Sequence, residues 1–178
     1  MNRSTRLWNV PNVISSSRVA LAVAFVLVND TPARIVLIAV AALTDFLDGL
    51  VARLSDQRSV VGALLDPIAD RLFVLAAVSA YLFNGLLTTG QYFIFISRDI
   101  ATAVGFIVAR IIPWLRPVTF RARLLGKAVT VLQLATLMAV LLQPSATPWL
   151  IVAIAILSAM SIFDYTLALW RARVRSPA

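Results

Sequence analysis

Six apolar stretches occupy most of the chain, and they constrain its fold more than any other feature. They cover residues 14–28, 33–52, 60–83, 92–112, 124–142 and 148–170. Each is close to the roughly 20 residues that an α-helix needs to cross a bilayer. Hydrophobic residues make up 61% of the 178 residues and charged residues only 13%, which leaves too little polar surface for a soluble domain of this size. The pattern predicts an all-α integral membrane bundle of six transmembrane helices.

The breaks between these stretches are short and rich in turn-forming residues, as in Asn29-Asp30-Thr31-Pro32 and Asn84-Gly85. None resembles a flexible linker, so we expect a single domain over residues 1–178. Residues 1–13 are too polar for a cleavable signal peptide and are expected to form a short juxtamembrane segment at the interface.

Basic residues gather at the N-terminus, where Arg18 opens the first stretch, in the breaks after the second and fourth stretches, and at the C-terminus. Near the other breaks the basic residue is Arg34, at the start of the second stretch. By the positive-inside rule, both termini are expected in the cytoplasm. The net charge of +8 then indicates contact with anionic membrane lipids and not with nucleic acid. The expected location is a bacterial inner or plasma membrane, crossed several times.

The chain contains no cysteine and no histidine, which excludes thiolate or imidazole metal sites and the usual general base. Any chemistry must use aspartate, arginine, lysine and hydroxyl groups. Five of the eight acidic residues lie within one segment of 26 residues; Asp56 belongs to its polar turn, and the other four lie in apolar sequence: Asp45, Asp48, Asp66 and Asp70. A carboxylate inside a membrane segment costs roughly 2.5–3.5 kcal/mol, so four together require a partner.

The spacing of these residues predicts two helix faces that meet. Asp45, Asp48, Gly49 and Ala52 recur at i, i+3, i+4 and i+7, and Gly62, Asp66 and Asp70 recur at i+4 after a turn. Oxygen-only ligands favour hard cations, so we expect Mg²⁺ or Mn²⁺, with two ions matching the carboxylate count. Small residues leave room for close approach, and Arg53 has a planar fork suited to phosphate.

The pattern Asp45-x2-Asp-Gly-x2-Ala-Arg-x8-Gly-x3-Asp-x3-Asp70 resembles, without a departure, the signature of the CDP-alcohol phosphotransferase family. The resemblance implies a six-helix membrane enzyme, a homodimer, that uses divalent metal to displace CMP from a CDP-linked lipid with an acceptor hydroxyl. The metal ligands would be Asp45, Asp48, Asp66 and Asp70, with Asp70 also the general base. The CDP site would comprise Asp48, Gly49, Ala52, Arg53, Gly62 and Asp66.

The acceptor is predicted from weaker resemblances. The opening Asn9-Val-Pro-Asn-Val-Ile-x3-Arg18 resembles both cardiolipin synthases and phosphatidylglycerol phosphate synthases. Ile96-Ser-Arg98-Asp99 followed by Arg110 is more similar to cardiolipin synthases, whereas Lys127-x2-Thr130-x2-Gln133 resembles both, with Val129 departing from the usual lysine. We therefore expect transfer of a phosphatidyl group from CDP-diacylglycerol to phosphatidylglycerol, forming cardiolipin, with glycerol 3-phosphate as the alternative acceptor. The candidate acceptor-binding residues are Arg98, Asp99, Arg110 and Lys127.

Other interpretations of these residues remain open. Arg98 and Asp99 are adjacent on a helix and need not pair, because neighbouring side chains point about 100° apart. Lys127 either contacts phosphate or extends to the interface, and Arg110 either orients the protein or attracts an anionic lipid. Asp164 is expected to have no catalytic role. A cation transporter is the alternative from another class, but the two halves show no repeat, and ion passage does not explain the glycine and arginine positions.

Overall fold

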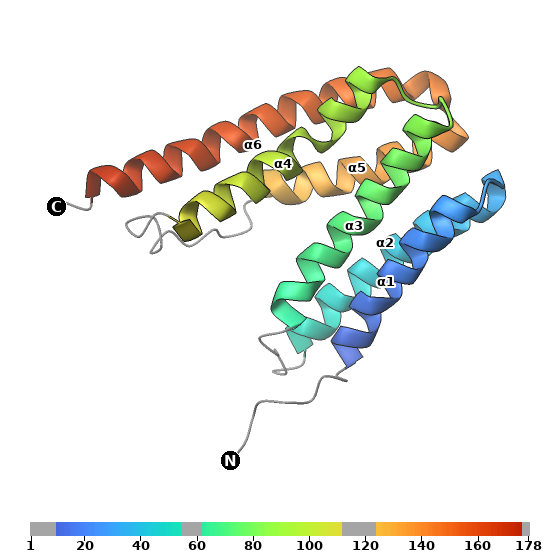
Figure 1. Cartoon of the computed structure of the whole chain (residues 1–178), viewed down its shortest axis with the longest axis horizontal. Helices are drawn as coiled ribbons and strands as arrows, with labels where there is room; N and C mark the ends of the chain where they lie inside the picture. Colours follow the sequence, from blue (N-terminus) through green and yellow to red (C-terminus); the bar gives the residue numbers. More distant parts are fainter. Residues whose placement is uncertain (1–9, 55–61, 112–123, 176–178) are drawn as a thin grey trace, which may run out of the picture. The chain divides into compact units, whose positions relative to one another are not determined.

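The computed structural model describes residues 10–54, 62–111 and 124–175, and within them every regular element is a helix (Figure 1). The α-helices are α1 (Val10–Leu27), α2 (Thr31–Leu54), α3 (Gly62–Phe83), α4 (Thr89–Ile111), α5 (Leu124–Leu142) and α6 (Thr147–Arg175), with a short 3₁₀ helix, η2 (Pro144–Ala146), before α6. The all-α class is confirmed. The helices follow the expected stretches closely, except that α1 begins at Val10, inside the expected juxtamembrane segment, and α6 continues to Arg175.

Two helices begin where the sequence supplies a side-chain cap. The Ala33 amide donates to the Asp30 carboxylate, at 3.1 Å, in the first turn of α2. At α4 the Thr88 amide donates to Gln91 Oε1 at 2.9 Å, and the Gln91 amide donates to Thr88 Oγ1 at 3.3 Å. This reciprocal capping box satisfies amides that have no partner inside the helix.

The turn after α3 depends on a glycine. Gly85 has a φ of +71°, in the left-handed region where residues with a side chain are strained. The Gly85 amide donates to the Leu82 carbonyl at 3.0 Å, and the Leu86 amide donates to the Tyr81 carbonyl at 2.9 Å. These two bonds form a Schellman motif, which explains why α3 ends before Asn84-Gly85.

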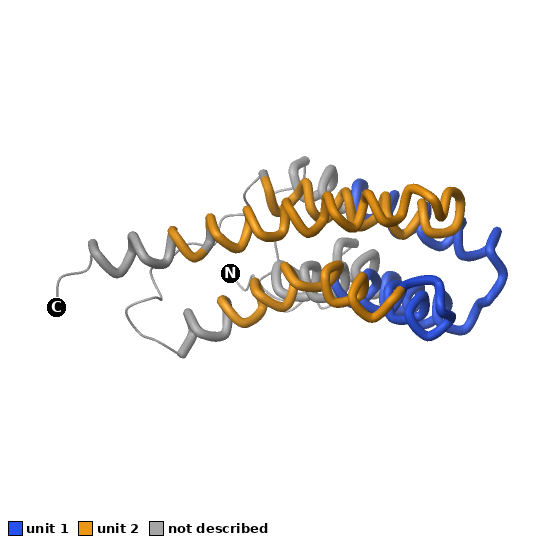
Figure 2. The backbone as a smooth tube through the Cα atoms, turned by 90° about the horizontal axis from the view of Figure 1, so that it is seen from above, with its two compact units in different colours: residues 1–87 blue, residues 88–178 orange. Residues whose placement is uncertain are grey.

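The helices form two compact units, residues 1–87 and residues 88–178, coloured separately in Figure 2. In the first unit, α1 packs against both α2 and α3. Its core contains Phe25 of α1 with its ring centroid 5.9 Å from that of Phe73 and 5.6 Å from that of Tyr81, both of α3. Both pairs are edge-to-face, the arrangement that aromatic quadrupoles favour.

In the second unit, α6 packs against both α4 and α5. Four apolar side chains with no solvent exposure form its core: Phe95 of α4, Val129 and Leu137 of α5, and Ile154 of α6. Polar side chains also lie inside this unit, among them Gln133 and Thr136 of α5 and Ser158 of α6. Of these, Gln133 donates hydrogen bonds to α4, whereas the Thr136 hydroxyl bonds to the Leu132 carbonyl of its own helix.

Large apolar side chains also cover outward faces of the helices. On α6 they recur at helical spacing: Trp149, Val152, Ile156, Met160 and Phe163 are all at least half exposed. Two segments within the described residues, Leu125–Leu142 and Pro144–Asp164, are long and apolar enough to cross a membrane, with mean hydropathies of 1.9 and 2.0. Continuous exposed apolar faces of this kind favour a lipid environment over water.

Candidate functional site

The aspartate motif lies on two helices of the first unit. Asp45, Asp48, Gly49, Ala52 and Arg53 lie on the C-terminal half of α2, and Gly62, Asp66 and Asp70 lie on the first turns of α3. Because α2 is helical to Leu54, residues three, four and seven positions apart lie on the same face. Asp45, Asp48, Gly49 and Ala52 therefore share one face of α2. Among the motif aspartates, the structure describes the side chain of Asp45; the contacts predicted for the others lie outside the described side chains.

Asp45 faces a buried cation from α1. Its Oδ1 lies 3.7 Å from Arg18 Nη2, and the Arg18 side chain is 3% exposed while that of Asp45 is 48% exposed. The pair is therefore asymmetric: the guanidinium is held inside the unit, and the carboxylate remains accessible to a ligand. A buried cation needs a nearby anion, which Asp45 supplies from the adjacent helix.

From its place in the sequence, Arg18 was counted among the basic residues that orient the protein in the membrane. In the structure it is buried inside the first unit, beside Asp45 of the motif. One signal could have found it. Arg18 lies inside the first apolar stretch, and an intramembrane charge generally has a partner and a function. The sequence alone did not show that this partner is Asp45.

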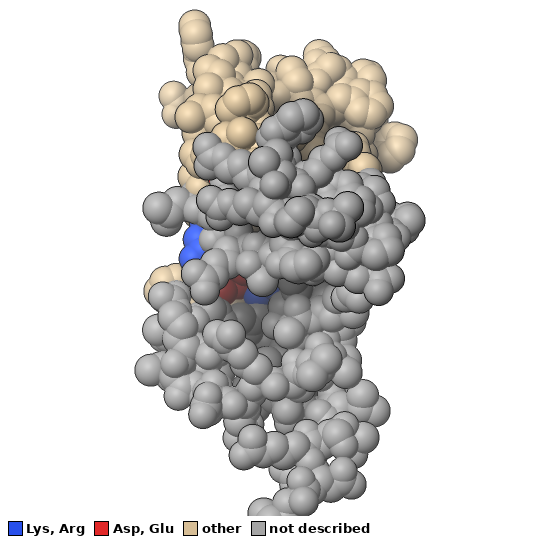
Figure 3. Space-filling view, turned by 90° about the vertical axis from the view of Figure 1, so that its left-hand side faces the viewer, with Lys and Arg blue, Asp and Glu red and all other residues tan. Residues whose placement is uncertain are grey.

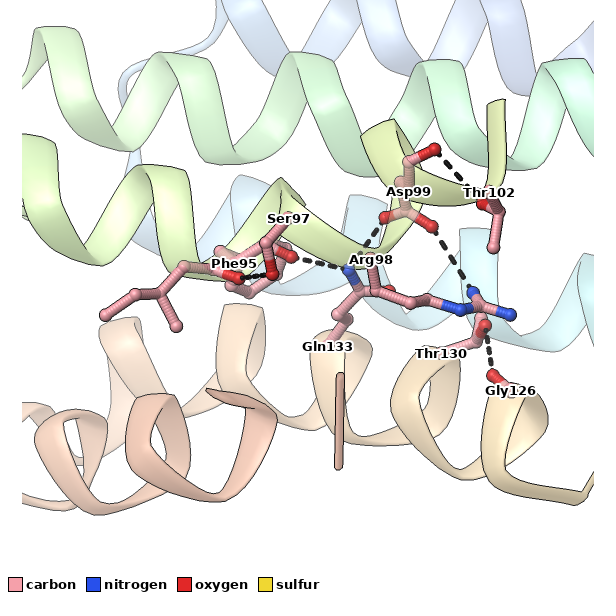
Figure 4. A network of polar contacts seen from close by, with 9 residues as sticks. Phe95, Ser97, Arg98, Asp99, Thr102, Gly126, Thr130 and Gln133 are labelled. Atoms are coloured by element: carbon pink, nitrogen blue, oxygen red, sulfur yellow. Dashed lines mark hydrogen bonds and ion pairs between the residues drawn. The ribbon is translucent and has the colours of Figure 1, made fainter. Parts of the chain in front are cut away.

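A second polar site lies in the other unit, where the side chains of α4 and α5 meet (Figure 4). Arg98 Nη1 lies 3.3 Å from Asp99 Oδ1. Gln133 Nε2, from α5, donates to Asp99 Oδ2 at 2.8 Å and to the Phe95 carbonyl at 2.8 Å. Each carboxylate oxygen of Asp99 therefore accepts from a different residue, and Gln133 joins one turn of α4 to α5.

The guanidinium of Arg98 is poorly satisfied within the described part of the chain. Arg98 is 9% exposed, and its Nε is buried without a hydrogen-bond partner there. A guanidinium has five N–H donors in a fixed fork and cannot lose its charge in a protein. A buried donor left in this way is costly unless a ligand or water supplies the acceptor.

The structure answers one open question from the sequence, since Arg98 and Asp99 do form a pair. Adjacent positions diverge by about 100°, but the long arginine side chain curves back to reach its neighbour. Gln133 was noted only as part of a resembling segment, with no role. An amide in the middle of a largely apolar helix was the available signal, because buried amides require partners.

The remaining candidate acceptor residues are less constrained. Lys127 lies near the start of α5 and is exposed, and Arg110 lies on the last turn of α4 with its side chain outside the described set. Arg98, Asp99 and Lys127 all belong to the second unit, whereas the motif belongs to the first. Figure 3 shows only small areas of basic and acidic atoms of described residues on the face that it draws.

Comparison with known proteins identifies the family. The sequence model for CDP-alcohol phosphatidyltransferase matches residues 8–164. A CDP-diacylglycerol–glycerol-3-phosphate 3-phosphatidyltransferase of Aquifex aeolicus is 37% identical over 109 residues, which are 57% of this chain and 61% of that protein. A protein of the same name from Pseudomonas fluorescens is 42% identical over 76 residues, 39% of each chain.

Relatives of the other predicted type match as well. The CMP-forming cardiolipin synthase of Homo sapiens is 32% identical over 112 residues, which are 60% of this chain and 37% of that protein. The matches thus span less than two thirds of the length of these relatives. The family match extends over nearly the whole chain and includes the aspartate motif. The chain belongs to the CDP-alcohol phosphatidyltransferase family, as the motif predicted.

Proposed function

We propose that the protein transfers the phosphatidyl group of CDP-diacylglycerol to an acceptor hydroxyl and releases CMP. The observation that carries this proposal is the complete aspartate motif on α2 and α3 of a chain that belongs to this family. The names of the relatives support it, because they describe phosphatidyl transfer and CMP formation.

The donor set of the motif fits a divalent metal. It offers carboxylate oxygens alone, which suit Mg²⁺ or Mn²⁺, and the described carboxylate, Asp45, is half exposed and so open to a ligand. Asp45, Asp48, Asp66 and Asp70 would hold the metal, which we propose as two ions. When bound, such ions neutralise charge on diphosphate oxygens.

The protein's own residues perform the remaining tasks. Asp70 takes the proton from the acceptor hydroxyl, whose oxygen forms a bond to the lipid-proximal phosphorus. The bond from that phosphorus to the CMP oxygen breaks, and CMP leaves toward the cytoplasm. Arg53 binds a phosphate oxygen, and Gly49, Ala52 and Gly62 leave space for the cytidine and diphosphate. Direct displacement is favoured over a covalent intermediate, because the chain contains no histidine or cysteine and the fixed positions of the motif include no serine to serve as a nucleophile.

We propose phosphatidylglycerol as the acceptor, so that the product is cardiolipin, with glycerol 3-phosphate as the second candidate. Both acceptors contain a phosphate, and the buried guanidinium of Arg98 has donors that suit one. Asp99, Arg110 and Lys127 complete the proposed acceptor site. Relatives named for each product match this chain, so their names support both candidates.

The proposed arrangement in the membrane is a homodimer with six spans per chain, both termini in the cytoplasm and the motif near the cytoplasmic side. The exposed apolar faces support it. The chain contains no cysteine, so single cysteines can report topology without a background. In intact cells, Asn84→Cys should react with a membrane-impermeant maleimide, and Ser176→Cys should react only after lysis. The reverse pattern would contradict this orientation, and chemical crosslinking would test the dimer.

The decisive experiment is a turnover assay on protein in lipid nanodiscs, with CDP-diacylglycerol, Mg²⁺ or Mn²⁺, and each acceptor separately. CMP and lipid product are followed together. Asp45→Ala, Asp66→Ala and Asp70→Ala should each abolish turnover while the protein still inserts. The control is Asp30→Asn, which changes an exposed aspartate outside the motif and keeps a capping side chain. Retained turnover in all three motif variants would refute the proposal, and the chelator EDTA should stop the reaction.

A further inference from the structure

The side-chain amide of Gln133 is buried and donates hydrogen bonds to two acceptors on one turn of α4. The residue is 2% exposed, and both of its partners, the Phe95 carbonyl and Asp99 Oδ2, lie 2.8 Å from Nε2. Both partner atoms accept hydrogen bonds from Gln133, so the nitrogen end of the amide faces them. The two N–H groups of Gln133 are therefore both used, and neither can rotate away without leaving a buried acceptor unpaired.

This contact determines how Asp99 meets Arg98. With Oδ2 held by Gln133, the carboxylate presents Oδ1 to Arg98 Nη1 at 3.3 Å. The carboxylate thereby limits the rotation of the guanidinium, whose Nε stays buried without a partner among the described residues (Figure 4). A preoriented guanidinium loses less conformational entropy when it binds phosphate than a free arginine side chain does.

We propose that Gln133 is a positioning residue for the acceptor: through Asp99 it orients Arg98 so that the guanidinium receives the phosphate of the acceptor alcohol. This inference rests on the proposed function and adds a residue that contacts neither the acceptor nor the reacting atoms. Its effect should therefore fall on acceptor binding and leave the CDP-diacylglycerol site, on the other unit, unchanged.

The test replaces Gln133 by leucine, which has a similar volume and no donor. Thr136→Val is the matched control: Thr136 is fully buried on the same helix face, and its hydroxyl bonds only to the Leu132 carbonyl of its own helix, at 2.7 Å. With the full chain in nanodiscs, Gln133→Leu should raise the KM for phosphatidylglycerol about tenfold, the low end expected for loss of a hydrogen bond to a charged group. The KM for CDP-diacylglycerol and kcat at saturating acceptor should change less than about twofold.

Two further variants separate positioning from general packing. Gln133→Glu keeps the size but puts a second carboxylate against Asp99, so it should raise the acceptor KM more than Gln133→Leu does. In an Asp99→Asn background, Gln133→Leu should have little additional effect, because the two residues act in series.

The outcomes distinguish this inference from the function on which it rests. An active wild type with an unchanged acceptor KM in Gln133→Leu, or equal changes in Gln133→Leu and Thr136→Val, would overturn the positioning role alone. Additive effects of Gln133→Leu and Asp99→Asn would also overturn it. A wild type that transfers to neither phosphatidylglycerol nor glycerol 3-phosphate would overturn the proposed function, and this inference with it.

Discussion

Replacing Arg34 should destabilise the first unit more than any exposed substitution, because this side chain links three helices. Arg34 belongs to α2 and is 3% exposed. Its Nε donates to the Val28 carbonyl at 2.7 Å, and its Nη2 donates to Asn29 Oδ1 at 3.1 Å, both just beyond the end of α1. Its guanidinium also lies 5.3 Å from the ring centroid of Phe25 and 6.0 Å from that of Tyr81.

The magnitude follows from these contacts. A hydrogen bond to a charged donor contributes about 1.5–3 kcal/mol, and the bond to the part-buried Val28 carbonyl falls near the low end. The bond to the exposed Asn29 adds about 0.5 kcal/mol, because water can replace it. Cation–π contact adds about 0.5–1 kcal/mol, and the helix C-terminus adds a few tenths. Arg34→Met keeps the apolar stem but loses these contacts, so it should lower the free energy of unfolding by about 3 kcal/mol. The net loss is smaller by the desolvation penalty of the buried cation, which methionine does not have.

Thermal unfolding in nanodiscs, followed by tryptophan fluorescence, measures this cost. On the scale of water-soluble chains of this length, about 3 kcal/mol lowers Tm by roughly 6–12 °C. Arg34→Lys keeps the charge but not the planar fork, so it should lose about half as much. Lys127→Met, an exposed control on α5, should change Tm by less than about 2 °C. A Tm for Arg34→Met equal to or above that of the wild type would show that the desolvation cost exceeds the contacts, and would refute the reasoning.

Three further predictions follow from local geometry. Arg18→Met should lower the half-saturating Mg²⁺ concentration for turnover several-fold, because it removes a cation that competes for Asp45; an increase would show that Arg18 instead holds Asp45 in place. Gly85→Ala should lower the free energy of unfolding by about 1 kcal/mol, measured by heat or denaturant, because an added Cβ meets nothing within 4 Å and only the positive φ opposes it. Gly85→Asn should lower it less, since asparagine tolerates a positive φ; equal losses would show that the positive φ is not the reason. Thr88→Ala should cost about 1 kcal/mol through loss of the cap to Gln91, and Thr88→Ser should restore it; failure of serine to do so would assign the loss to packing.

Much of the fold could be predicted because its signals are local. Apolar length, turn residues and capping residues lie close together in the sequence, so the six helices were expected near their observed ranges. The helix ends differ more: α1 begins at Val10, four residues before the expected span, because the apolar pattern fixes helix ends less closely than helix interiors. The six-span topology and the single domain stay predictions.

The family was also predictable, because aspartates inside apolar helices are costly and their regular spacing indicates a ligand to bind; the chemistry of the motif stays a prediction. The partners of individual side chains were not. Helical spacing shows which residues share a face, but not how each helix is rotated or how deeply it lies against its neighbour. The pairing of Arg98 with Asp99 is an example, since spacing alone left it open.

The sequence by itself determined the helices and the family, because the length of each apolar stretch and the spacing of the motif are local properties of the chain. The tertiary structure alone decided that Arg18 lies beside Asp45, that Arg34 rests on two aromatic rings, and that Gln133 holds Asp99. The reason is that a buried polar group in so apolar a chain must find a partner, and only the packing of separate helices determines which one it finds.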